Sequence, residues 1–88
     1  MNTKVLGDEI ALPISTGAAT SFSSATVVRL VNTDTNAHVI SIVETQSGAG
    51  IGSMTLPGGS VEQLIKIASH CVFSDSALVR GTKVGITN

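Results

Sequence analysis

The chain has 88 residues and a net charge of −1, with 42% hydrophobic, 12% charged and only 2% aromatic residues. Five scattered cations and the absence of Trp and Tyr disfavour nucleic-acid binding and the stacking of sugars. One cysteine rules out an intrachain disulfide, no apolar run reaches the length of a membrane span, and no signal peptide is predicted. An excess of Val, Ile and Leu with Ser, Thr and Gly is typical of strands in one small domain.

Residues 1–24 predict an N-terminal arm with edge strands. Residues 3–6 form a short strand candidate, and residues 9–14 a second extended piece that Pro13 confines to a sheet edge. Residues 15–24 are rich in Ser, Thr, Ala and Gly. They predict a loop, a weak strand, or a segment that becomes ordered on a partner.

Residues 26–45 predict a hairpin. Strands over 26–32 and 37–45 flank four turn-forming residues, whose side chains can bond their own backbone. The second strand is apolar on both faces, with Ile40 and Ile42 on one side and Val39 and Val43 on the other. A strand buried on both sides implies two layers, or one layer and a neighbouring subunit.

The C-terminal half predicts further strands. The sharp turn signal Pro57-Gly58-Gly59 separates a strand over 51–56 from its expected partner over 60–67. Alternation in the latter gives one mostly aliphatic face, made of Val61, Gln63, Ile65 and Ile67. Leu64 is then exposed on the opposite face, at an interface or a local bulge, and the alternative for this segment is a helix. A short piece at 71–73 and a final strand over 77–87 complete the pattern.

Many short strands with frequent turn signals and no crossover helices predict an all-β fold. The expected architecture is a small antiparallel β-sandwich or jelly-roll-like barrel with an extended N-terminal arm. Residues 1–24 are the arm and residues 25–88 the β-sandwich domain, in a single domain overall. The thin core of so small a domain favours stabilisation by assembly.

No pattern in the chain predicts a catalytic residue, a metal site or a cofactor. His38 and His70 could serve a small lyase or hydrolase, but no nucleophile elbow accompanies them. His70 and Cys71 are adjacent, so on a strand they point to opposite faces and cannot jointly hold a metal. Asp34 is one carboxylate, too few for a calcium loop, and the glycines of 48–52 lack the Lys-Ser/Thr of a phosphate-binding loop. The expectation is a protein that is not an enzyme and has no small-molecule substrate.

Four segments carry a resemblance to a class of known proteins. They are Thr3-Lys4-Val5-Leu6, Val27-Val28-Arg29-Leu30-Val31-Asn32, Met54-Thr55-Leu56-Pro57-Gly58-Gly59-Ser60-Val61-Glu62 and Thr82-Lys83-Val84-Gly85-Ile86-Thr87-Asn88. In these segments the chain resembles small all-β virion structural proteins of tailed bacteriophages, especially phages of marine bacteria. The resemblance implies a capsid decoration (cement) protein, which is made in the host cytoplasm, sits on the capsid surface and bridges neighbouring major capsid subunits.

The expected partners are the major capsid protein and copies of the chain itself, with a trimer favoured and no nucleic acid or membrane involved. The candidate interface residues are Val5, Leu6, Ile10, Leu12, Ile14, Val39, Val43 and Leu64. The alternative is an immunoglobulin-like binding module on a phage tail or fibre that contacts the host surface.

Overall fold

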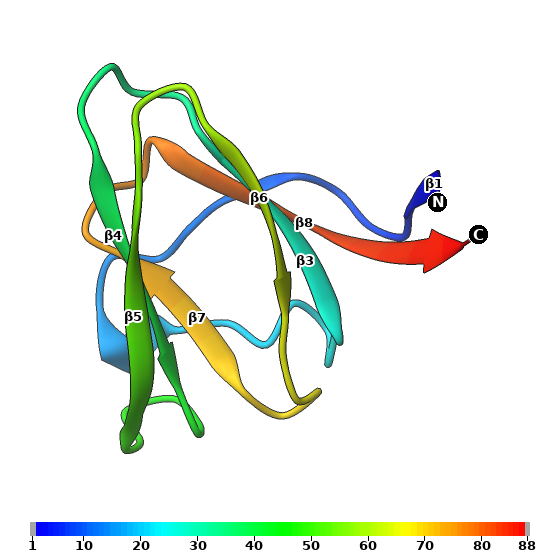
Figure 1. Ribbon diagram of the computed structural model, residues 1–88. Coiled ribbons are helices and arrows are strands. Elements are labelled where there is room, and N and C mark those ends of the chain that lie inside the picture. Colours follow the sequence, from blue (N-terminus) through cyan, green and yellow to red (C-terminus); the bar gives the residue numbers. More distant parts are fainter. Residues whose placement is uncertain (1, 88) are drawn as a thin grey trace.

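Two antiparallel sheets packed face to face make up the computed structural model, which describes residues 2–87 (Figure 1). The first sheet has the order β1-β8-β3-β6, with β2 also beside β8, and the second has the order β5-β4-β7. The elements are β1 (Asn2–Val5), β2 (Ile10–Ala11), a short 3-10 helix η1 (Thr16–Ala18), β3 (Val27–Asn32), β4 (His38–Val43), β5 (Gly50–Leu56), β6 (Val61–Ile65), β7 (Cys71–Ser74) and β8 (Val79–Thr87). The predicted all-β sandwich is confirmed. Met1 of the predicted arm and Asn88 of the predicted domain lie outside the described residues.

The core lies between the inward faces of β3 and β8 in one sheet and β4 and β7 in the other. Alternation in β3 turns Val28 and Leu30 inward, and both are fully buried. Ile40 from β4 and Val72 from β7 meet them from the second sheet. Each such side chain contributes about 1.5–3 kcal/mol through burial.

Neither of the two predicted hairpins forms. β3 pairs with β6 and β8, while β4 pairs with β5 and β7, so the turn at 33–36 crosses between the sheets. The Pro57-Gly58-Gly59 turn crosses in the same way between β5 and β6. A buried side chain holds the first crossing, since Asn32 Nδ2 donates to the carbonyl of Leu56 at 2.9 Å.

The N-terminal segment belongs to the sandwich. β1 and β2 run along β8 as edge strands, as the sequence predicts for residues 1–24. Leu12, Ala19 and Phe22, however, are only 1%, 0% and 6% exposed, so this segment also supplies core side chains. The expectation of an arm separable from residues 25–88 is therefore corrected. The sequence did not indicate the core positions Ala19 and Phe22, because the many small residues of 15–24 are typical of a loop.

Phe22 packs directly over a strand glycine. A Cβ on Gly81 would lie 2.6 Å from the Cζ atom of Phe22, so only glycine lets the ring approach the backbone of β8 this closely. Phe22, Ser23 and Ser24 have φ values of 54°, 56° and 58°. Left-handed backbone costs about 1–2 kcal/mol per non-glycine residue, and burial of the Phe22 ring offsets part of this cost.

β6 turns its aliphatic side away from the core. Val61 and Ile65 lie opposite β3 residues that point outward, and they are 48% and 77% exposed. Leu64 lies opposite Val28 and packs half-buried against the core. The prediction that Leu64 is exposed is therefore wrong. Pairing with β3 determines which face of the sheet Leu64 lies on. The sequence alone could not show this, because β3 has apolar residues on both faces.

β4 is apolar on both faces, as predicted, but the chain covers part of its second face itself. Val43 lies opposite Cys71, on the face turned away from the main core. Ala19 packs on this pair, with Phe73 beside them, in a small second cluster. Val43 is thus only 5% exposed and is covered by its own chain, whereas Val39, on the same side of β4, is 40% exposed.

Candidate interaction surfaces

The eight predicted interface residues do not form one surface. Five are exposed: Val5, Leu6, Ile10, Ile14 and Val39. Leu12 and Val43 are buried, and Leu64 packs against the core. The prediction for Leu12 is wrong because the inner side of the edge strand faces the core. The exposed five are divided between the N-terminal segment and, for Val39, the second sheet.

The two chain ends form a ribbon that extends beyond the sandwich (Figure 1). The last four residues of β8 pair with β1. The pairing of β8 with β3 stops just before them, at Lys83. Val5 in this ribbon is 69% exposed, but Val84 opposite it is buried. Thr3 receives a 2.9 Å hydrogen bond from the Gln63 amide of β6, so the ribbon contacts the outer side of the first sheet at this point.

Four aliphatic side chains lie in the remaining part of that outer face, and two of them, Val61 and Ile65, are exposed, while Val27 and Val31 are half-buried. We call this surface the β3–β6 face. It consists of Val27, Val31, Val61 and Ile65. Val27 pairs with Ile65 and Val31 with Val61, and Arg29 with Gln63 lies between the two pairs. Sequence alternation had grouped Val61 with Ile65, but it could not show that this side faces solvent.

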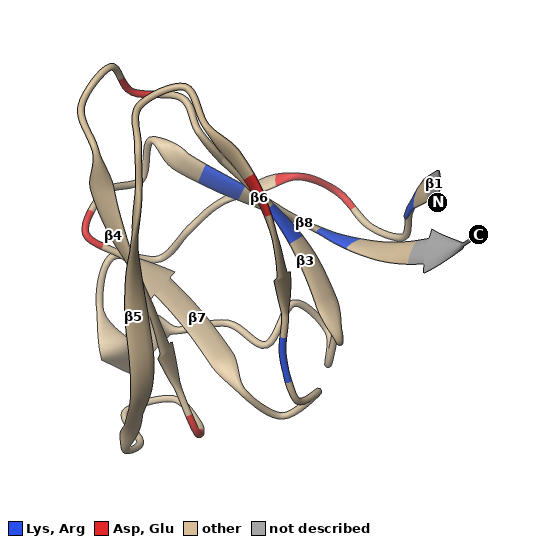
Figure 2. Cartoon of the chain, in the orientation of Figure 1, with Lys and Arg blue, Asp and Glu red and all other residues tan. Residues whose placement is uncertain are grey.

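The strands of the second sheet contain no Lys, Arg, Asp or Glu. Figure 2 shows Lys, Arg, Asp and Glu on the first sheet, the N-terminal segment and the turns, whereas β4, β5 and β7 carry none. β5 stands at the edge of this sheet, and no described strand pairs with its outer side. Depletion of charge marks the centre of protein interfaces, and an unpaired edge offers free backbone groups.

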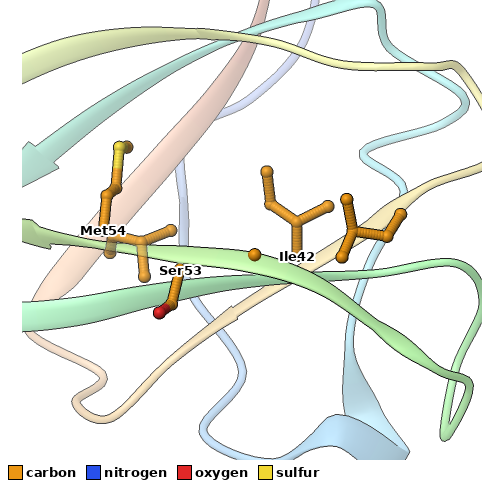
Figure 3. A pocket seen from close by; sticks show the side chains of 6 residues that line it. Ile42, Ser53 and Met54 are labelled. Atoms are coloured by element: carbon orange, nitrogen blue, oxygen red, sulfur yellow. The ribbon is translucent and has the colours of Figure 1, made fainter.

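An apolar groove opens beside β5. Its volume is about 220 Å³, and its lining comprises Ile40, Ile42, Ile51, Gly52, Ser53 and Met54. Ile42 and Met54 point to one side of the strands, while Ser53 points to the other (Figure 3). A Cβ on Gly52 would meet no atom within 4 Å. The groove is therefore unfilled beside this glycine.

The edge of the first sheet at β6 is guarded by charge. Lys66 directly follows this strand and is only 7% exposed, with Nζ donating to the carbonyl of Ala68 at 3.2 Å. Burial lowers the pKa of Lys66. An inward-pointing lysine and a strand charge such as Glu62 are devices that discourage edge pairing. This leaves β5 as the edge better suited to adding a strand.

A histidine clamps two turns together at one end of the sandwich. His38 Nε2 lies 2.7 Å from Asp34 Oδ2, and its Nδ1 lies 2.8 Å from Asp75 Oδ1. Ionised carboxylates only accept hydrogen bonds, so the two contacts fit the protonated ring, in which both nitrogens donate. A general base needs a free ring nitrogen, which His38 does not have in this arrangement. No sequence pattern indicates the clamp, since Asp75 is distant from Asp34 and His38 in the chain.

The clamp is expected to make stability depend on pH. The hydrogen bond to Asp34, with the charge of Asp75, raises the pKa of His38 above 6.5, and the same bond lowers that of Asp34 below 3.8. The contribution of His38 is therefore full below pH 6.5 and disappears as pH rises through its folded pKa. The contribution of Asp34 is present above pH 3.8 and disappears as pH falls through its folded pKa.

Thermal unfolding between about pH 6 and about pH 9 checks this expectation. The melting temperature should fall across this range, and His38→Gln should flatten the fall. His70→Gln is the matched control and should retain the wild-type slope. An unchanged slope in His38→Gln would show that the clamp does not stabilise the fold.

The chain matches no protein-family model, no curated protein and no solved structure. Within residues 2–87, no helix is long and apolar enough to cross a membrane. The same residues contain no group of three or more His, Cys, Asp or Glu side chains placed to hold a metal ion. The surfaces above are thus the basis for assigning a function.

Proposed function

We propose that the chain is a non-enzymatic structural protein of a bacteriophage virion, which decorates the capsid and stabilises the head through protein–protein contacts. The observation that carries this proposal is the β3–β6 face. Ile65 is 77% and Val61 48% exposed on the outer side of the first sheet, beside the point where Gln63 donates to Thr3 of the N-terminal segment. An aliphatic face left open in so small a domain favours a partner surface over solvent.

The partner in this role is the major capsid protein, together with copies of the chain, for which the resemblance implies a trimer. Two of the segments that carry the resemblance, residues 27–32 and 54–62, contain β3 and the start of β6. They therefore include three of the four residues of the β3–β6 face, namely Val27, Val31 and Val61. Full burial of an aliphatic side chain stabilises by about 1.5–3 kcal/mol, and the loss of translational and rotational freedom on docking offsets much of the sum over this small face, so one docked copy binds weakly. Many copies on one shell add up to a substantial stabilisation.

Co-sedimentation with emptied, undecorated capsids of the phage that encodes the chain tests the proposal. The wild type should bind at a saturating stoichiometry. Ile65→Asp should bind at least about tenfold more weakly, because it places a charge in an apolar contact. Leu78→Asp is the matched control, since Leu78 is 51% exposed in the turn before β8 and lies outside the face.

Two outcomes would contradict the proposal. Wild-type protein that stays in the supernatant would exclude capsid decoration, and its binding to host cells would favour the tail or fibre module. Equal binding by Ile65→Asp and the wild type would show that the β3–β6 face is not the docking surface.

A further inference from the structure

We propose that two copies of the chain pair through β5, antiparallel about a two-fold axis, to form one continuous sheet. The occupant of the open β5 edge is thus a second copy of the same strand. The inference goes beyond the proposed function, because it needs neither a capsid nor the β3–β6 face.

Size complementarity between the residues of β5 supports this pairing. In a register centred on Ser53, Gly52 lies opposite Met54 of the second copy, and Gly50 lies opposite Leu56. At both glycines of β5, Gly50 and Gly52, a Cβ would meet no atom within 4 Å. Gly52 therefore leaves room for the half-buried Met54 of the other copy, whereas Leu56 stays in its own core, where it is 2% exposed.

The same register fills the apolar groove. Residues directly opposite each other in a sheet share one face, so Met54 of the second copy lies on the groove side of Gly52. The groove is lined there by Ile42 and Ile51, and Met54 is an unbranched side chain that adapts to irregular apolar space. The pairing of β5 and the filling of the groove thus both favour a second copy of the chain as the partner.

Charge also permits the pairing of β5 with itself. A two-fold axis brings equivalent residues close together, and like charges directly opposite each other repel. The seven residues of β5 include no charged residue and no proline, so neither repulsion nor a missing donor opposes pairing. β6 contains Glu62, so a register centred on that residue would bring two carboxylates together.

The expected dimer is weak in solution. A single strand pair buries less than the roughly 1,600 Å² of a standard interface, so a dissociation constant in the micromolar range or above is expected. The proportion of dimer should therefore rise with protein concentration. A two-fold pair does not by itself produce the trimer that the resemblance implies, and the measured mass separates the two.

The pairing is tested by the molar mass that light scattering gives for size-exclusion peaks, at protein concentrations up to about 1 mM. Variants with opposite charges at Ser53 are measured beside the wild type. The wild type should approach twice the 8.9 kDa mass of the chain. Ser53→Lys and Ser53→Glu should each stay monomeric, because Ser53 faces its own copy across the axis, and an equimolar mixture should recover the doubled mass. Gln63→Lys, at the centre of the β6 edge, is the matched control and should dimerise like the wild type.

A wild-type mass of one or three copies at this concentration would overturn the inference, and so would dimers of Ser53→Lys. Ser53→Lys retains the β3–β6 face, so its binding to capsids is a separate readout. Retained capsid binding with lost pairing supports both proposals. Intact pairing with no capsid binding refutes the proposed function alone.

Discussion

Removal of residues 1–24 is expected to leave residues 25–88 unable to fold. The deletion takes Leu12, Ala19 and Phe22 out of the two buried clusters and exposes one edge of β8. Loss of a buried leucine costs about 2–5 kcal/mol and of a buried phenylalanine about 3–5 kcal/mol, which together rival the roughly 5–15 kcal/mol stability of a whole domain. Far-UV circular dichroism and amide chemical-shift dispersion should show an unfolded chain.

A shorter deletion provides the control for this experiment. Removal of residues 1–5 deletes the exposed side chains of Thr3, Lys4 and Val5 and leaves Leu12 and Phe22 in place. This variant should unfold cooperatively. A cooperative transition in residues 25–88 would instead show that the N-terminal segment is dispensable for the fold.

Replacement of Asn32 by leucine is expected to destabilise the fold by about 3 kcal/mol or more. The Asn32 side chain is fully buried and donates to the carbonyls of Leu56 and Asn36, at 2.9 Å each. Its Oδ1 accepts from the amide of Asp34, also at 2.9 Å. Leucine has a similar size but leaves these backbone groups without partners, at about 1–3 kcal/mol for each buried group. Urea unfolding should show a lower midpoint with an unchanged slope.

Two further variants make the Asn32 experiment specific. Asn32→Asp keeps the acceptor for the amide of Asp34 but sets a carboxylate against two carbonyls, so it should be as destabilised as Asn32→Leu. Asn36→Ala changes an exposed side chain in the same turn and should stay within about 0.5 kcal/mol of the wild type. Wild-type stability in Asn32→Leu would contradict the role assigned to this residue.

The sequence predicted the strands but not which strands pair. Period-two alternation located β3, β4, β5, β6 and β8, because alternation reflects local strand geometry. A hairpin and a crossing between sheets present the same turn residues, however, so the turns after β3 and β5 were both misassigned. The difference lies in long-range contacts such as that from Asn32 to Leu56.

The candidate surfaces were predictable only in part. Alternation grouped Val61 with Ile65, but the side facing solvent depends on β3, whose Val27 and Val31 are as apolar as its inward residues. Val43 illustrates the opposite case. It has the pattern of an interface residue, but Ala19, distant in sequence, covers it. Short polar stretches such as residues 15–24 give no periodic signal for core positions.

Electron cryomicroscopy of capsids saturated with the protein tests the central proposal most directly. We expect density for this sandwich on the outside of the shell, with Ile65 and Val61 of the β3–β6 face against the major capsid protein. Capsids without bound density, or copies bound with the β3–β6 face toward solvent, would contradict the proposed function.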